Sequence, residues 1–193
     1  MITDRRNFLA LIATGLASRS LAQTSNNGAA MSPVTAYAFS FPGLGGEPVR
    51  LSAYAGKPLL VVNTASLCGY TPQYTGLEKL FVKFHGRGLT VIGVPSNDFG
   101  EQEPGGPAEI AQTAQQEYGV TFPLTAKAEV KGPNAHPFYK WAASERPQDT
   151  PKWNFHKYLV GRDGHIAGVF ASAVEPLDAH VVEAVERELN RAE

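Results

Sequence analysis

The most nucleophilic side chain that proteins offer occurs once in this chain, at Cys68. Residues 59–62 before it form a short apolar, partly β-branched run typical of a buried strand, and residues 77–84 after it carry apolar side chains at helical spacing. Thr71 is an N-cap candidate, and Pro72 suits the first helical position. Cys68 is therefore predicted at a strand-to-helix turn, where the partial positive charge of the helix end favours the reactive thiolate.

A single cysteine is often an ordinary small buried hydrophobe, and Cys68 taken alone leaves that alternative open.

A polar loop is predicted to lie beside this thiol. Residues 89–94 form a second apolar run, so strand, helix and strand make a βαβ unit with parallel strands. Ligand sites in parallel sheets lie outside the carboxyl ends of the strands. The turn-rich segment 95–105 leaves at that edge, and we expect it to reach Cys68.

The whole pattern predicts an α/β domain with a central mixed sheet flanked by helices and an N-terminal hairpin. The hairpin is predicted from residues 37–39 and 49–51, and further helices from residues 108–118 and 137–143. A second hairpin is predicted from residues 155–160 and 165–170, with Asp163-Gly164 in its turn. An amphipathic closing helix is predicted with its apolar face formed by Leu177, Val181, Val182, Val185 and Leu189.

Composition excludes several classes of function. Lys and Arg number 17 against 18 Asp and Glu, with no basic run after the N-terminal segment, so nucleic acid is not an expected partner. The five His residues show no spacing typical of metal ligands, and no metal is expected. With one cysteine no internal disulfide can form, so any disulfide chemistry involves a second molecule.

The N-terminus has the pattern of an export signal. Arg5 and Arg6 precede an uncharged run at residues 8–17 that is too short to cross a membrane, and small residues allow cleavage after Ala22. The alternatives are an uncleaved anchor and a chance basic N-terminus. We predict a twin-arginine type signal and a periplasmic location. The predicted organisation is a signal peptide at residues 1–22, a flexible linker at 23–33 and one domain at 34–193.

Five ordered motifs resemble those of the glutathione peroxidase family. They lie at residues 63–71, 88–105, 118–123, 134–137 and 153–155. The resemblance runs in order through nearly all of the chain after the predicted linker. It implies a thioredoxin-like fold and an oxidoreductase that reduces peroxides with a cysteine in place of the selenocysteine of many relatives. It also implies a thiol as reducing co-substrate and no bound cofactor.

The resemblance assigns a catalytic tetrad of Cys68, Gln102, Trp153 and Asn154. Cleavage of a peroxide O–O bond develops negative charge first on sulfur and then on oxygen, and two amides and an indole N–H are neutral donors suited to both. Each residue also has a structural alternative. Gln102 could be a loop surface residue, Trp153 a packing aromatic and Asn154 a turn former.

Two positions depart from the relatives that depend on thioredoxin. Those relatives commonly carry further cysteines where this chain has Ser96 and Ala114. Cys68 therefore has no partner within the chain, and the departure favours glutathione or another external thiol, including a thiol protein, as reductant. Asp98 and Thr64 also depart from the usual pattern, with no effect that the sequence assigns.

The segment before Trp153 is short. Residues 142–152 lack the long insertion that tetrameric relatives use in assembly, which resembles the monomeric subgroup with an open site. Such a site can admit lipid hydroperoxides at a membrane surface.

Three functions are consistent with these residues. The first is a one-cysteine peroxidase acting on hydrogen peroxide and on organic or lipid hydroperoxides. The second is a redox sensor or relay that passes oxidation from Cys68 to a partner protein, although Thr71 replaces the second cysteine of a Cys-x-x-Cys site. The third is a silent binding module, which the intact tetrad argues against.

Replacing both Arg5 and Arg6 with Lys is expected to stop export, because the paired arginines are the signal that a twin-arginine route reads. The measurement is the amount of protein in the periplasmic fraction by immunoblot. Arg19→Lys is the matched control, since Arg19 lies outside the pair and should leave export unchanged. Unchanged export of the double variant would rule out this route.

Overall fold

The structure is a computed structural model that describes Met1 and residues 33–191. The predicted signal peptide and almost all of the predicted linker lie outside the described residues. Within residues 33–191, no helix combines the length and the apolar character needed to cross a membrane.

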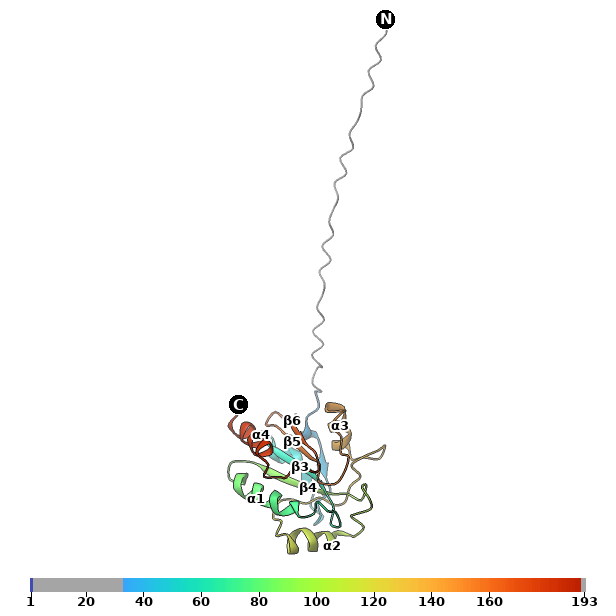
Figure 1. The fold of residues 1–193 in the computed structure, drawn as a ribbon, viewed down its shortest axis with the longest axis vertical. Coiled ribbons are helices and arrows are strands. Elements are labelled where there is room, and N and C mark those ends of the chain that lie inside the picture. The colour runs from blue at the N-terminus through green and yellow to red at the C-terminus, as the bar shows by residue number, and fades with distance from the viewer. Residues whose placement is uncertain (2–32, 192–193) are drawn as a thin grey trace. The chain divides into compact units, whose positions relative to one another are not determined.

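A mixed four-stranded sheet in the order β4-β3-β5-β6 forms the centre of the domain, as predicted (Figure 1). Strand β3 (Leu59–Thr64) pairs in parallel with β4 (Thr90–Pro95). On its other side β3 pairs antiparallel with β5 (Lys157–Val160), which pairs antiparallel with β6 (Ile166–Phe170). Because β3 and β4 are parallel and adjacent, the turn after β3 and the loop after β4 leave at the same edge.

Helices cover both faces of this sheet (Figure 1). Helices α1 (Gln73–His85) and α4 (Ala179–Asn190) pack on one face, in a cluster that contains Cys68. Helix α3 (Pro137–Glu145) and the N-terminal hairpin pack on the other face, in a second cluster. Side chains of β3 alternate between the two clusters, so all six of its residues are buried. A strand buried on both faces explains the continuous apolar run in the sequence.

The N-terminal hairpin exists, but its first strand begins after the residues 37–39 predicted for it, and its second strand is one residue shorter than predicted. Strand β1 covers Ser40–Phe41 and β2 covers Val49–Arg50, while residues 36–38 and 51–54 form 3₁₀ turns. The 3₁₀ turn at residues 36–38 is held against the turn between β5 and β6, because the Tyr37 hydroxyl donates to the carbonyl oxygen of Gly161 at 3.1 Å. This segment therefore packs on the β5–β6 turn and is not available to extend β1.

Two further predictions need correction. The helix predicted over residues 108–118 is α2 (Pro107–Ala111) followed by a π-helical segment at Gln112–Glu117. Leu177, predicted on the apolar face of the last helix, lies before α4 begins and is 45% exposed. Val181 and Val185 are buried as predicted. The apolar spacing thus predicts a helix that begins two residues before the observed start at Ala179.

Gly164→Ala is expected to destabilise the domain by about 2 to 4 kcal/mol, by adding backbone strain and overpacking. Gly164 has φ of +83°, and a Cβ there would lie 2.7 Å from the Thr35 Cβ and 2.8 Å from the Tyr37 ring. The measurement is the free energy of unfolding in urea. Gly132→Ala is the matched control, because Gly132 has φ of +76° and open space around it. Equal losses in the two variants would show that packing against residues 35–37 contributes nothing.

Candidate functional site

The turn that holds Cys68 follows strand β3 directly. Cys68 is 7% exposed, and the backbone N–H of Tyr70 donates to its Sγ at 3.4 Å. The Thr71 hydroxyl accepts from the Cys68 N–H at 3.1 Å and donates to the Ala65 carbonyl oxygen at 2.9 Å. These bonds fix the turn, and the Tyr70 N–H directs a backbone donor at the sulfur.

Thr71 thus closes the turn and does not cap the helix as the sequence predicts. Helix α1 begins at Gln73, with Pro72 at its N-cap position and no side-chain cap. The backbone reaches the helix through tight turns, in which the Thr71 N–H donates to the Cys68 carbonyl oxygen and the Gln73 N–H to that of Tyr70. The predicted sequence of strand, cysteine turn and helix is confirmed, and the helix starts one residue later.

The loop after β4 reaches the cysteine turn, as predicted. The Leu67 N–H donates to the Gln102 carbonyl oxygen at 2.9 Å, which ties the residue before Cys68 to this loop. Within the loop, Asn97 Oδ1 accepts from the Glu103 N–H at 2.9 Å. Gln102 is held from both sides by these backbone contacts.

Asp98, which departs from the family pattern, anchors the same loop. Its Oδ2 accepts from the backbone N–H groups of Val130 at 2.6 Å and Lys131 at 3.1 Å. A carboxylate that accepts from two backbone N–H groups makes charge-assisted hydrogen bonds, which are stronger than bonds between neutral groups. The structure therefore gives Asp98 a local anchoring role that the sequence did not assign.

Asn154 orients the side chain of Gln102. Asn154 is fully buried, and its Nδ2 donates to Gln102 Oε1 at 3.0 Å and to the Phe99 carbonyl oxygen at 3.3 Å. Because Gln102 Oε1 faces Asn154, the amide Nε2 of Gln102 faces away from it. Among residues 33–191 this Nε2 has no hydrogen-bond partner, so both of its N–H groups are available to a ligand.

Trp153 lies over the loop after β4. Its ring centre is 6.0 Å from that of Phe99, and a Cβ on Gly100 would lie 3.3 Å from its Cη2. The side chain is 39% exposed, which is unusual for so large an apolar group. Trp153 thus packs on Phe99 and also leaves part of its ring open to solvent, and its catalytic role stays a prediction.

Asn63, at the end of β3, holds the segment 153–155 in place. Its Nδ2 donates to the Trp153 carbonyl oxygen at 3.1 Å, and its own carbonyl oxygen accepts from the Phe155 N–H at 2.6 Å. Asn63 is fully buried. The strand that leads to Cys68 thus also positions Trp153 and Asn154.

Backbone strain is concentrated at this site. Within the described part of the chain, the non-glycine residues with positive φ are Glu101 at 52° and Phe155 at 63°. One directly precedes Gln102 and the other directly follows Asn154. A bulky residue such as Phe in the left-handed region costs about 1 to 2 kcal/mol, and such strain persists where the surrounding structure enforces it.

The structure gathers all four predicted site residues at one edge of the sheet. Gln102 contacts the turn of Cys68 through Leu67, Asn154 bonds to Gln102, and Trp153 is adjacent to Asn154 in the chain. In residues 33–191, the donor that hydrogen-bonds Sγ is the Tyr70 N–H, which the sequence analysis missed. The sequence could have indicated this donor, because in a tight turn the backbone N–H two residues after a cysteine can reach its sulfur. Donation from the three side chains to sulfur or peroxide stays a prediction.

Comparisons with known proteins identify the family. The sequence profile of the glutathione peroxidase family matches residues 36–143, more than half of the 193-residue chain. Hydroperoxy fatty acid reductase gpx1 of Synechocystis sp. is 48% identical over 151 residues, covering 74% of this chain and 89% of that protein. The chain belongs to the glutathione peroxidase family. The resemblance drawn from the five motifs is confirmed, and the protein is a peroxidase of the oxidoreductase class.

Other members of the glutathione peroxidase family are similar along the same stretch. A glutathione peroxidase of Lactococcus lactis is 45% identical over 143 residues, covering 72% of this chain and 91% of that protein. A crystal structure of Trgpx in its apo form has a TM-score of 0.65 and 37% identity, covering 81% of this chain and 99% of that one. A thioredoxin-family protein of Chlorobium tepidum has a TM-score of 0.60 at 16% identity, covering 82% and 97%. This last likeness concerns the fold, which is thioredoxin-like as predicted.

Two ionisable side chains are buried close to the tetrad of this glutathione peroxidase-family protein. Glu103 is 1% exposed, and burial raises the pKa of its carboxyl, partly opposed by hydrogen bonds with Ser66. Lys157 is fully buried, its Nζ donates to the Phe155 carbonyl oxygen at 2.7 Å, and burial lowers its pKa to about 8. The sequence analysis missed both groups, because neither type is ordinarily buried.

A cavity of about 590 Å³ adjoins Trp153. We call it the side cavity and define it by Tyr70, Trp153, His156, Val169 and Ala171, which are among the residues that line it. Tyr70 of the cysteine turn and Val169 of strand β6 both line it. Cys68, Gln102 and Asn154 are not among its lining residues.

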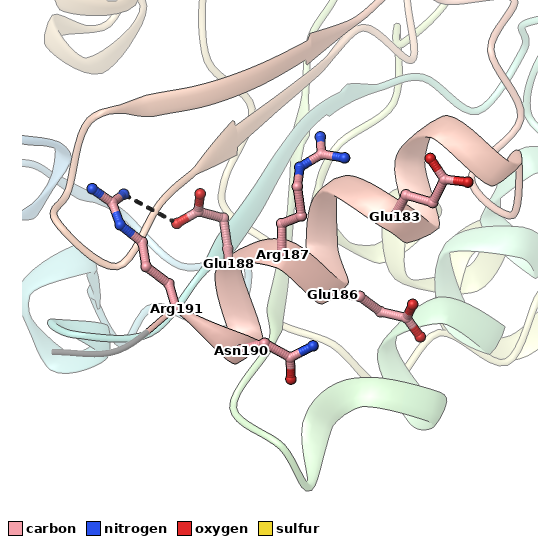
Figure 2. A pocket seen from close by; sticks show the side chains of 6 residues that line it. All are labelled: Glu183, Glu186, Arg187, Glu188, Asn190 and Arg191. Carbon is pink, nitrogen blue, oxygen red and sulfur yellow. Dashed lines mark ion pairs between the residues drawn. The ribbon is translucent and has the colours of Figure 1, made fainter.

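Another hollow, of about 670 Å³, lies along helix α4 (Figure 2). Charged and amide side chains of this helix and of Arg191, which directly follows it, line the hollow, and Arg191 pairs with Glu188 at 3.6 Å. Figure 2 shows these side chains pointing outward from the helix. The hollow contains none of the four predicted site residues and no nucleophile, so we assign it no part in the chemistry.

His156 in the side cavity is a buried neutral imidazole. It is 5% exposed, and its Nε2 has no hydrogen-bond partner among the described residues. Burial lowers its pKa to about 4, with a smaller contribution from the positive charge of Lys157. The ring is therefore uncharged at neutral pH.

His156→Gln is expected to flatten the dependence of stability on pH. Between the unfolded pKa near 6.5 and the folded pKa of about 4, the unfolded chain binds a proton that the folded chain does not. Stability therefore falls as pH falls through this window, by about 1.4 kcal/mol per unit and roughly 2 kcal/mol between pH 6.5 and 5. Urea unfolding at pH 7, 6 and 5 measures the slope. His180→Gln, at an exposed position, is the control and should keep the wild-type slope. Equal slopes for wild type and His156→Gln would contradict the assignment.

Proposed function

We propose that this protein reduces hydrogen peroxide and organic hydroperoxides through Cys68, with glutathione or another external thiol as reductant. The observation that carries the proposal is the position of the single cysteine, with a backbone donor on its Sγ and the Gln102 loop bonded to its turn. The relative in Synechocystis sp. is named a hydroperoxy fatty acid reductase, which supports lipid-derived hydroperoxides as substrates.

In the first half-reaction, the Cys68 thiolate attacks the terminal oxygen of the hydroperoxide. A sulfur–oxygen bond forms while the O–O bond breaks, and the electron pair leaves on the second oxygen, which takes up a proton to give the alcohol or water. Sulfur is oxidised to sulfenic acid by two electrons. The site must therefore stabilise negative charge on sulfur and then on the departing oxygen.

The donors are arranged for these two charges. The Tyr70 N–H already contacts sulfur. The bond from Asn154 to Gln102 Oε1 leaves the Gln102 Nε2 free for the peroxide or the departing oxygen. The indole N–H of Trp153, a residue that is 39% exposed, is the further donor in this proposal. All are neutral donors, so none loses its role by titrating near neutral pH.

The second half-reaction depends on other molecules. Ser96 and Ala114 are fully buried and carry no thiol, so the chain cannot resolve the sulfenic acid itself. A first thiol condenses with the Cys68 sulfenic acid, releasing water and forming a mixed disulfide. A second thiol then releases Cys68 and leaves as the disulfide of the reductant. This balance requires two external thiols for each peroxide reduced.

The proposal includes export to the periplasm, supported by Arg5, Arg6 and the uncharged run at residues 8–17. Cytoplasmic thiol systems do not reach that compartment directly. The reductant is therefore a thiol delivered there, and Cys68 waits in an oxidised form whenever the supply is short.

The protein without residues 1–22 is expected to consume hydrogen peroxide and cumene hydroperoxide with glutathione, and Cys68→Ser is expected to abolish turnover because the nucleophile is lost. A coupled assay measures this, run separately with glutathione and with thioredoxin. Peroxide turnover that survives in Cys68→Ser would falsify the mechanism. Oxidation of Cys68 that only a protein partner reverses would favour the redox relay.

The rate at which peroxide oxidises Cys68 tests the contribution of each proposed donor. Gln102→Ala and Trp153→Ala are expected to slow oxidation of Cys68 by about 100 to 1,000-fold, the range for loss of a transition-state donor. Gln116→Ala, at an exposed position outside the site, is the control and should react like wild type. Wild-type oxidation rates in both site variants would remove these residues from the mechanism.

A further inference from the structure

Glu103, the residue after Gln102, has a buried carboxyl that the mechanism above does not use. It is 1% exposed, although Glu is rarely buried so fully unless it is paired. Within residues 33–191 its Oε2 has no hydrogen-bond partner. Burying a carboxyl in this way is unfavourable, so the position of Glu103 requires a reason in what the side chain contacts.

The side chain of Glu103 faces the turn that holds Cys68. The hydroxyl and the backbone N–H of Ser66, two residues before Cys68, both interact with the carboxyl and partly oppose the rise that burial causes in its pKa. A second contact joins the same two segments, since the Leu67 N–H donates to the Gln102 carbonyl oxygen at 2.9 Å. Gln102 and Glu103 thus connect the loop after β4 to consecutive residues of the cysteine turn.

The backbone of Glu103 is anchored on both sides. Its N–H donates to Asn97 Oδ1 at 2.9 Å, and its carbonyl oxygen accepts from Lys127 Nζ at 2.9 Å. The same Nζ donates to the Gly105 carbonyl oxygen at 2.9 Å. Because these bonds hold the backbone, the carboxyl has little freedom to move away from Ser66.

Hydroxyl groups of other segments lie near this carboxyl. The pKa of the Tyr74 hydroxyl on α1 is raised mainly by burial and to a smaller extent by the negative charge of Glu103, while Thr64 at the end of β3 interacts with the same hydroxyl. Thr64 Oγ1, Ser66 Oγ and the Tyr74 oxygen are buried, and in the described part of the chain none has a partner at full hydrogen-bond geometry. Polar groups of four segments therefore gather behind the cysteine turn.

We propose that Glu103 is a positioning residue for the peroxide reaction, whose carboxyl joins the Gln102 loop to the cysteine turn at Ser66 and so sets the distance between the Gln102 amide and Cys68 Sγ. The proposal rests on the proposed function, in which Gln102 donates to the reacting oxygens. Asn154 orients the Gln102 side chain, and Glu103 fixes the loop that carries it relative to the sulfur. Glu103 acts through Gln102 and not by contact with the peroxide.

Glu103→Ala is expected to slow oxidation of Cys68 by hydrogen peroxide roughly 10 to 100-fold, because a misplacement of about 1 Å can cost about 100-fold in rate. The single cysteine lets loss of thiol, followed by rapid quench, report this step without any reductant. Glu103→Gln should stay within about threefold of wild type, since it keeps the side-chain length and an acceptor for Ser66. Glu117→Ala and Glu117→Gln are the matched controls, because Glu117 is exposed and outside the site.

Combination with Gln102→Ala separates positioning from a general loss of structure. If Glu103 acts through Gln102, adding Glu103→Ala to Gln102→Ala should slow oxidation by less than about a further threefold. Glu103→Asp keeps the carboxyl but withdraws it from Ser66 by one methylene, with little risk to folding. It is expected to slow oxidation by at least about threefold alone, and to add nothing in the Gln102→Ala background.

Wild-type rates in both Glu103→Ala and Glu103→Asp would overturn the positioning role and leave the peroxidase proposal intact. Equal slowing with and without Gln102 would also overturn it, because Glu103 would then act by another route. A Glu103→Gln variant as slow as Glu103→Ala would do the same, by showing that the charge matters and not the contact. A wild-type rate in Gln102→Ala, or no oxidation of Cys68 by any peroxide in the wild type, would instead overturn the proposed function.

Discussion

The arrangement of the site depends on Asn63, the buried amide near the end of the central strand. Through its side chain and its carbonyl oxygen it binds the backbone on both sides of Asn154, while its own strand continues towards Cys68. One residue therefore connects two segments about 90 positions apart in the chain. Because Asn63 is buried and both bonds go to backbone atoms, they fix the position of the whole segment and not of one side chain.

The bonds from Asn63 also explain why the strained backbone of Phe155 is tolerated. Phe155 adopts a left-handed backbone conformation, and its N–H is bonded to Asn63 while its carbonyl oxygen accepts from the buried ammonium of Lys157. Burying Lys157 is itself unfavourable, as its lowered pKa shows. The strain at Phe155 and the burial of Lys157 both cost stability, and packing of the surrounding core offsets them. The bonds to Phe155 keep the neighbouring Asn154 where it can orient Gln102.

Local patterns predicted the fold well where burial and periodicity agree. The β3–α1–β4 unit, the mixed sheet and the C-terminal hairpin follow from apolar runs and turn residues, which act over a few positions. The errors occur where tertiary contacts override that signal. Residues 37 and 38 were predicted in a strand but form a 3₁₀ turn, because Tyr37 binds the β5–β6 turn. Leu177 precedes α4 although it fits the apolar spacing.

The sequence by itself determined the nucleophile, the four candidate site residues and the absence of a second thiol, because these depend on residue identity and order. Only the tertiary structure decided that the Tyr70 N–H contacts the sulfur, that Asp98 anchors its loop to residues 130–131, and that His156 is buried in a cavity beside Trp153. The physical reason is that hydrogen-bond direction, burial and cavity volume arise from segments brought together across the sheet. No local pattern of residue types specifies them.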